Sequence, residues 1–362
     1  MFGQKRRRSS IMRMIDVADT DNNQKVDFEE FVLLMKDADR DGSIQRATVE
    51  KKKMEGDNKV DLKKAEQELK KRLGRPNLSR DDLNASVYGN LSAVRIEETP
   101  QFVAAKTKEF DTILESTAAA KKANVTLAKE KVPEQLDDRH KLMFLRAELF
   151  EAAKAVDRCC RHWDFVLDIF GPEKAFLPLT QEGALRDDLE ILKLPVLNDT
   201  LMKDDFGQHV LFLDKRSVAL TKYEARALCR ATFYTFQNRL EEDEEAQKNG
   251  VVVQILTPTS PTTWNIKFAK KMLSWVRQGA PVRLACAHMM YPAPFFSIMF
   301  RVTRILAGEL SSRLKIFGGS ESEVMENMKK FGLDRDRIVK NLGGTLVLER
   351  EQWLQERADA GK

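Results

Sequence analysis

The sequence of 362 residues lacks the features that mark secreted, membrane-spanning or zinc-rich proteins. It has only four cysteines, and two of these, Cys159 and Cys160, are adjacent, so it contains neither a secretory disulfide pattern nor a Cys-x-x-Cys motif. The densest apolar run, Phe295–Phe300, is far shorter than the roughly 20 residues that span a bilayer. We therefore expect a cytoplasmic protein with reduced thiols and no membrane span.

A strong excess of one charge is also missing. Lys and Arg total 61 against 56 for Asp and Glu, which gives a formal net charge of +5 spread along the chain. This balance does not require a nucleic-acid partner, and we expect none. The weakly positive charge is compatible with transient, peripheral contact with an anionic membrane surface. The sequence does not fix the oligomeric state, and we expect a monomer.

Sequence motifs of the common enzyme classes are absent as well. There is no P-loop, nucleophile elbow or phosphatase Cys-x5-Arg, so we expect no enzymatic activity. Cys286 and His288 are two residues apart on a predicted strand and therefore share a face. We interpret His288 as a hydrogen-bonded histidine at a sheet end and Cys286 as a small core residue. His162, beside Trp163, has no metal-ligand spacing.

What is present divides the chain into four segments. Residues 1–75 mix acidic and basic side chains, and residues 76–133 are expected to be a linker and an exposed helix, with one amphipathic helix over 101–131. Apolar side chains at helical spacing indicate a helical lead-in domain at 134–200. Residues 201–350 form the last domain.

In this last segment short apolar stretches typical of strands alternate with longer stretches that have the apolar spacing of helices. Strands are predicted at 207–214, 251–256 and 281–288, and helices at 223–240 and 262–278. Strands that alternate with long helices need crossover connections, which make the sheet largely parallel. The expected fold class is α/β, with a mostly parallel sheet flanked by helices, a small helical lead-in domain and an all-α amino-terminal region.

The amino-terminal region carries an acidic stretch with the ligand spacing of a calcium loop. Calcium takes six to eight oxygen ligands. Oxygen ligands stand at the required places of a twelve-residue loop: Asp19, Asp21, Asn23, the Lys25 carbonyl, Asp27 and Glu30. The stretch resembles an EF-hand, and the resemblance implies calcium as a cofactor. Gln24 replaces the usual Gly where the chain turns with positive φ, at a cost of about 1–2 kcal/mol, which predicts weakened binding.

Two segments compete for the role of a second hand. Residues 37–48 offer weaker metal candidates but no bidentate ligand at the end of the loop, and these candidates are Asp37, Asp39, Asp41 and Ser43. Residues 53–64 resemble the first loop in sequence, and Val60 lies 34 residues after Val26, but this segment lacks ligands. The sequence leaves this alternative open.

The order of features after Phe144 resembles the CRAL-TRIO lipid-binding family over roughly 200 residues. The matching pieces are Phe144-Leu-Arg-Ala147, Lys203-Asp204 with Gly207, the helix with Trp264 and Trp275, Pro281-Val-Arg283-Leu, Tyr291-Pro-Ala-Pro294, Arg313–Gly318 and Leu342-Gly-Gly344. The second strand ends in Leu256-Thr257, where the family often has an acidic residue, and Met290 or Tyr291 stands in place of an Asn. These departures concern the polar details of a ligand site.

A hydrophobic chamber is expected independently of this resemblance. Residues 295–306 are apolar on most of the girth of a helix, so this helix must be buried or must cover a removable apolar ligand. The resemblance implies that it is a gate. We predict that the lipid cavity and gate include Phe268, Met272, Phe295, Phe296, Met299 and Phe300. Arg283 and Arg313 are candidate ligands for a phosphate head group.

The leading hypothesis is a protein that binds, and transfers between membranes, a hydrophobic lipid such as a phospholipid, a phosphoinositide or an isoprenoid. Calcium at the amino-terminal loop would be its regulatory input. The alternative is a calcium-responsive adaptor or membrane-docking protein with no exchangeable lipid. A more distant alternative is a hydrolase with an unrecognised site.

Overall fold

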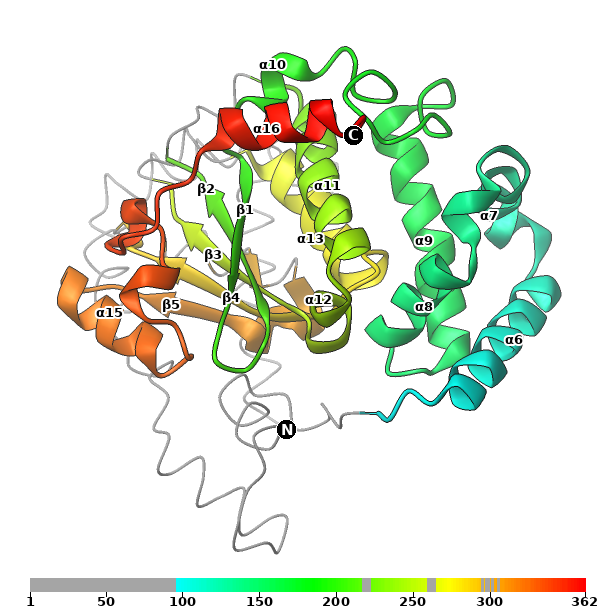
Figure 1. Ribbon diagram of the computed structural model, residues 1–362, viewed down its shortest axis with the longest axis horizontal. Coiled ribbons are helices and arrows are strands. Elements are labelled where there is room, and N and C mark those ends of the chain that lie inside the picture. The colour runs from blue at the N-terminus through cyan, green and yellow to red at the C-terminus, as the bar shows by residue number, and fades with distance from the viewer. Residues whose placement is uncertain are drawn as a thin grey trace, which may run out of the picture.

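Figure 1 shows the computed structural model of the chain. It describes residues 96–216, 223–258, 265–293 and 307–362, together with residues 296, 300, 303 and 304. The predicted calcium loop at 19–30 and both candidate second loops lie outside the described residues, as do Phe295 and Met299 of the predicted gate. Within the described ranges, no helix is long and apolar enough to cross a membrane.

The lead-in helices form a layer of their own beside the α/β part (Figure 1). They are α6 (Pro100–Ser116), α7 (Ala119–Lys131), the 3-10 turn η1 (Pro133–Leu136), α8 (Asp138–Ala147) and α9 (Ala152–Phe170). Helix α9 is central, because α6, α7 and α8 all contact it. Its buried side chains recur every three or four residues, and it ends at Gly171, which has a φ of 75°.

The prediction of a single helix over 101–131 is wrong, because α6 and α7 are separate helices. The hydroxyl groups of Ser116 and Thr117 both donate to the Ile113 carbonyl, at 3.0 and 2.8 Å. Such side-chain bonds to the backbone compete with continuation of a helix. Both helices then fold onto α9, and Phe110 of α6 is fully buried.

Five strands form one sheet in the order β1-β2-β3-β4-β5. They are β1 (Leu197–Lys203), β2 (His209–Asp214), β3 (Val251–Leu256), β4 (Leu284–Met290) and β5 (Leu314–Phe317). β1 is antiparallel to β2, and the other neighbours are parallel. The predicted mostly parallel sheet is confirmed, with β2, β3 and β4 near the three predicted positions, whereas β1 and β5 were not predicted as strands.

The remaining helices surround this sheet (Figure 1). They are α10 (Leu189–Leu192), α11 (Ala225–Glu242), α12 (Glu244–Asn249), α13 (Ile266–Gln278), α15 (Glu321–Lys329) and α16 (Arg350–Asp359), with 3-10 turns η4 (Gly308–Arg313), η5 (Arg335–Arg337) and η6 (Lys340–Leu342). Helices α11 and α13 lie between the sheet and the lead-in layer, and α15 lies on the opposite side (Figure 1).

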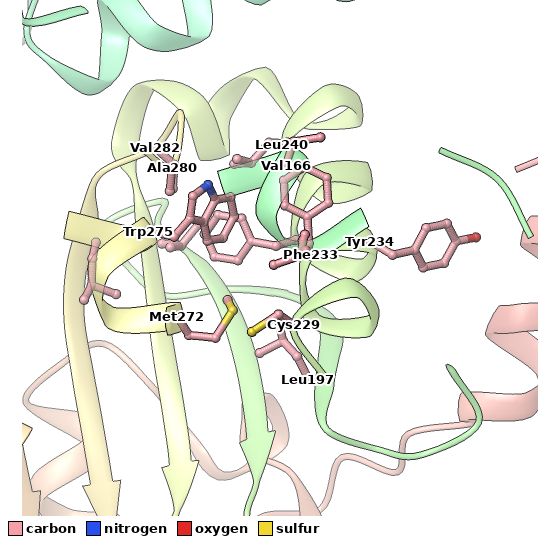
Figure 2. Close-up of a cluster of buried hydrophobic side chains, with 14 of the residues drawn as sticks. Val166, Leu197, Cys229, Phe233, Tyr234, Leu240, Met272, Trp275, Ala280 and Val282 are labelled. Atoms are coloured by element: carbon pink, nitrogen blue, oxygen red, sulfur yellow. The ribbon is translucent and has the colours of Figure 1, made fainter. Parts of the chain in front are cut away.

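Two separate cores result from this layering. The α13 face of the sheet includes Leu211 and Ala287, and it packs with α11, α13 and the lead-in helices in the larger core. Figure 2 shows part of this core, where Trp275 of α13 and Phe233 of α11 meet with ring centroids 5.3 Å apart. The α15 face includes Val210 and Val252, and it packs with α15 in the smaller core.

Helix α16 runs across the top of the molecule, from the sheet toward the lead-in layer (Figure 1). Its first residue, Arg350, donates hydrogen bonds to the carbonyls of Leu192 and Leu197 and to the Thr235 hydroxyl. These three acceptors belong to α10, β1 and α11. The carboxyl-terminal helix thus fastens three elements that are distant in sequence.

Candidate functional site

The α13 face of the sheet carries apolar side chains in two rows across four parallel strands. Strand register aligns Leu211, Val253, Ala287 and Leu314 in the first row. It aligns Leu213, Ile255, Met289 and Ile316 in the second row. Because side chains alternate along each strand, all eight point to the same side of the sheet.

This face is not completely filled by the helices above it. Val252, on the α15 face of β3, is fully buried, whereas its neighbour Val253, on the α13 face, is only partly buried. Leu213 of β2 is partly buried too. β3 is the middle strand of five, so a side chain there loses its accessible surface unless space remains above it. Val253 and Leu213 thus keep accessible surface on this face, whereas the other six side chains of the two rows are buried.

The described cavity and gate residues of the prediction lie in the core on this side of the sheet. Phe268 and Met272 extend from α13, where the Asn265 side chain caps the helix by accepting from the Phe268 amide at 2.9 Å. Phe296 and Phe300 are buried in the same core, with stacked rings 6.0 Å apart. That these four side chains line a lipid chamber stays a prediction.

The two ends of β2 on this face differ in their polar contacts. At the amino end, buried His209 lies 2.7 Å from Asp199 and 3.4 Å from Asp243. Burial opposes the charged form of His209, but these carboxylates outweigh it and raise its pKa. At the carboxyl end, Lys215 follows the alternation of Leu211 and Leu213, and burial lowers its pKa to about 8.

The two arginines predicted to meet a head group line one cleft at the amino ends of the strands. The cleft has a volume of about 760 Å³, and Lys154, Arg158, Arg161 and Arg277 also contribute to it. Sequence reasoning missed these four residues because the pattern does not show that α9, far from β4 in the chain, and the end of α13 meet at this cleft. Three acids, Glu148, Glu151 and Asp157, line the same cleft.

These arginines differ in how they are bound. Arg158 pairs with Glu148 and donates to three carbonyls at the end of α13, so it holds that helix end. Arg283 donates to the Lys248 carbonyl, and its buried Nε has no partner in the described part of the chain. Burial, and then the neighbouring charge of Arg313, lower the pKa of Arg283. An anion in the cleft would offset this repulsion.

On the α15 face, His288 is not the hydrogen-bonded histidine that we predicted. Its ring is fully buried, and neither nitrogen has a hydrogen-bond partner among the residues that the structure describes. It packs edge-on against Phe331 and Phe317, with ring centroids 4.5 and 5.4 Å away. Burial lowers its pKa to about 3. Gln254, its register neighbour on β3, is also buried with an unpartnered side-chain amide.

No other cluster of reactive side chains stands out among the described residues. All four cysteines are free and buried, and burial raises the pKa of Cys286 to about 12. His162 packs among aromatic rings, and burial lowers its pKa to about 4. Within the described part of the chain, no three His, Cys, Asp or Glu side chains are placed to hold a metal ion.

We compared the chain with curated proteins and with protein-family models. No curated protein matches the chain significantly. The family model of the CRAL/TRIO domain matches residues 200–344, which include all five strands except the first residues of β1, and also include η4, α15 and the cleft arginines Arg283 and Arg313. The CRAL/TRIO domain is a lipid-binding fold, consistent with a hydrophobic ligand. A CRAL/TRIO domain is therefore found at residues 200–344 of this chain.

Proposed function

We propose that the protein binds a lipid on the α13 face of its sheet and carries it between membranes. The observation that carries the proposal is the pair of apolar rows on this face, with Val253 and Leu213 still accessible on strands that helices cover. Burying a lipid chain there gains about 0.8 kcal/mol per CH₂ group, so no charged anchor is needed for affinity. The CRAL/TRIO match over residues 200–344 supports the same conclusion.

The direct test is the mass of the native protein. The full-length chain is purified without detergent and measured by native mass spectrometry, and bound lipid is then extracted and identified. We expect one lipid, or a small set of related lipids, at a stoichiometry near one per chain. An empty protein that also takes up no lipid from vesicles would contradict the proposal and favour an adaptor without exchangeable lipid. Hydrolysis of an added ester would contradict our expectation that the protein has no enzymatic activity.

A finer part of the proposal concerns the lipid head group. Arg283 and Arg313 share one cleft, and burial next to another cation makes Arg283 a favourable contact for a phosphate. We expect Arg283→Gln to weaken binding of a phosphate-bearing lipid. The matched control is Arg161→Gln, which removes an arginine of the same cleft that is already paired with Asp157. If both variants bind the phosphate-bearing lipid with equal affinity, the assignment of Arg283 to the head group is wrong.

The regulatory part of the proposal rests on the amino-terminal sequence alone. We infer that calcium at Asp19, Asp21, Asn23, Lys25, Asp27 and Glu30 alters the peripheral contact of the protein with anionic membranes in the cytoplasm. Co-sedimentation of the full chain with anionic vesicles, with and without calcium, tests this. Glu30→Gln removes the bidentate ligand and should abolish the response. A response that survives this substitution would refute the role of the loop.

A further inference from the structure

The inference concerns Lys215, which follows β2 at its carboxyl end. Its amide donates to the Leu256 carbonyl at 3.1 Å, so the strand register continues to this residue. Leu211, Leu213 and Lys215 are alternate residues and therefore point to the α13 face. Asp214 points to the other face, where its carboxylate accepts from Asn341 at 3.3 Å. Lys215 is thus the cation at the end of the apolar rows.

Lys215 has no polar partner in the described structure. No hydrogen bond or ion pair of its ammonium group is found, and the adjacent Asp214 is turned away. Its side chain is partly buried and keeps accessible surface, yet protein surrounds it closely enough for desolvation to lower its pKa. A side chain that is both desolvated and accessible borders an enclosed space. Leu213, two residues earlier on the same face, also keeps accessible surface.

His209 lies on the same strand and the same face as Lys215 and provides a comparison, because it is a buried cation with a structural role. Two carboxylates, Asp199 and Asp243, flank His209, and Arg239 and Lys203 pair with these carboxylates in turn. A buried charge without such partners is strongly unfavourable. Two carboxylates lie beside His209. Among the described residues no carboxylate lies beside Lys215, so its ammonium group is open to an anionic ligand.

We propose that Lys215 binds the anionic end of the lipid whose apolar part lies on the α13 face. The inference rests on the proposed lipid-binding function and names its ligand class, which is an amphiphile with a carboxylate or phosphate group. The arginine cleft lies at the amino ends of the strands, and Lys215 lies at the carboxyl end of β2, about 20 Å away along the strand. One anionic group cannot contact both, so the two assignments can be separated.

Matched pairs of ligands test the proposal on the full-length chain after lipid is stripped from it. Palmitate and 1-hexadecanol share an alkyl chain but differ in charge, and phosphatidic acid and diacylglycerol form the corresponding phosphate pair. We expect the wild-type protein to bind at least one anionic member more tightly than its neutral partner. The pair with the larger difference tells a carboxylate from a phosphate.

Three variants locate the charge that makes this difference. Lys215→Met keeps the length of the side chain and removes the charge, and it should lower affinity for the anionic ligand by about 30-fold or more while changing affinity for the neutral ligand by less than about 3-fold. Lys215→Arg should retain the preference. Lys193→Met removes an exposed lysine that is paired with Glu190 and should change nothing.

The outcomes separate the two proposals. If wild type binds both members of each pair equally, or if Lys215→Met keeps the preference, the role of Lys215 is refuted and lipid binding stands. If Arg283→Gln removes the preference and Lys215→Met does not, the anion belongs to the arginine cleft. If wild type binds none of the four ligands and carries no lipid, the proposed function itself falls. Thermal unfolding of each variant confirms that it is folded.

Discussion

On the α15 face of the sheet Val252 is fully buried, whereas on the α13 face the next residue, Val253, keeps accessible surface. The α15 face is closed by side chains of its own chain, including Phe331 and Met328, which are almost completely buried. On the α13 face two side chains of the apolar rows, Val253 and Leu213, keep accessible surface, and Lys215 at their end has no partner among the described residues. One face is thus closed by the chain's own side chains, and the other is the face on which we propose that a lipid binds.

The polar side chains on the two faces differ in the same way: those on the α15 face are enclosed, whereas Lys215 on the α13 face is accessible. Gln254 and His288 on the α15 face lack partners, but aromatic and aliphatic side chains enclose them and no accessible surface remains. They lower stability and offer no route to a ligand. Lys215 has no partner among the described residues either, but its side chain keeps accessible surface. An unpartnered polar group points to a ligand only where a ligand can reach it.

The largest expected effect comes from filling the space above the sheet. Val253→Phe adds volume on the α13 face, and we expect the protein to stay within about 1 kcal/mol of wild-type stability while it loses most of its bound lipid. Native mass spectrometry gives the lipid content, and urea unfolding gives the stability.

The matched control is the neighbouring residue on the closed face. Val252→Phe should overpack the α15 face and lower the free energy of unfolding by about 1–3 kcal/mol, while the lipid content per folded chain is unchanged. Should both substitutions destabilise the protein equally and leave the lipid bound, the distinction between the faces would be lost.

A smaller effect of opposite sign is expected from the unpartnered pair on the α15 face. Replacing Gln254 by Met and His288 by Leu removes buried polar groups without partners, and each change should raise the free energy of unfolding by about 1–3 kcal/mol. Gln247→Met is the control, because the Gln247 amide donates to the Leu240 carbonyl and accepts from Arg146, so its loss should destabilise. Destabilisation by the first two substitutions would indicate that ordered water satisfies the pair.

The smallest expected effect is the contribution of His209 to the pH dependence of stability. Its pKa is raised in the folded protein because Asp199 and Asp243 flank it, with Arg239 opposing and Lys203 paired to Asp243. The resulting stabilisation is complete below the unfolded histidine pKa of about 6.5 and is lost as the pH rises through the higher folded value. Urea midpoints of wild type should therefore fall across this window, and those of His209→Gln should fall less. Parallel curves would show that His209 is not charged in the fold.

Much of the fold could be predicted from the sequence, because its periodicity is strong where burial is complete. Val251–Leu256 has apolar side chains on both faces and reads as a buried parallel strand. β1 could not be predicted from the apolar pattern. It is an antiparallel edge strand with a register shift, and exposed Leu201 interrupts it with a φ of 57°. β5 has only four residues, one of them a lysine, and the pattern is too short to read.

The candidate site was predictable only in part. Phe268 and Met272 are large apolar residues at helical spacing, so their place in the core follows from the pattern. Lys215 has no such signal, because a lysine after a strand usually means solvent. Only the register that places it on the α13 face, and the absence of a described partner, distinguish it. Gln254 and His288 likewise needed coordinates, since hydrogen bonding cannot be read from residue type.

Arg350 of α16 bears on how the protein can be divided for experiments. The CRAL/TRIO match ends at residue 344, but Arg350 donates to the carbonyls of Leu192 and Leu197 and to the Thr235 hydroxyl. A fragment cut at the family boundary would leave these acceptors without their donor and would uncover the core that Leu354 helps to close. The smallest portion that folds on its own must therefore extend through the carboxyl-terminal helix, beyond the limits that homology assigns.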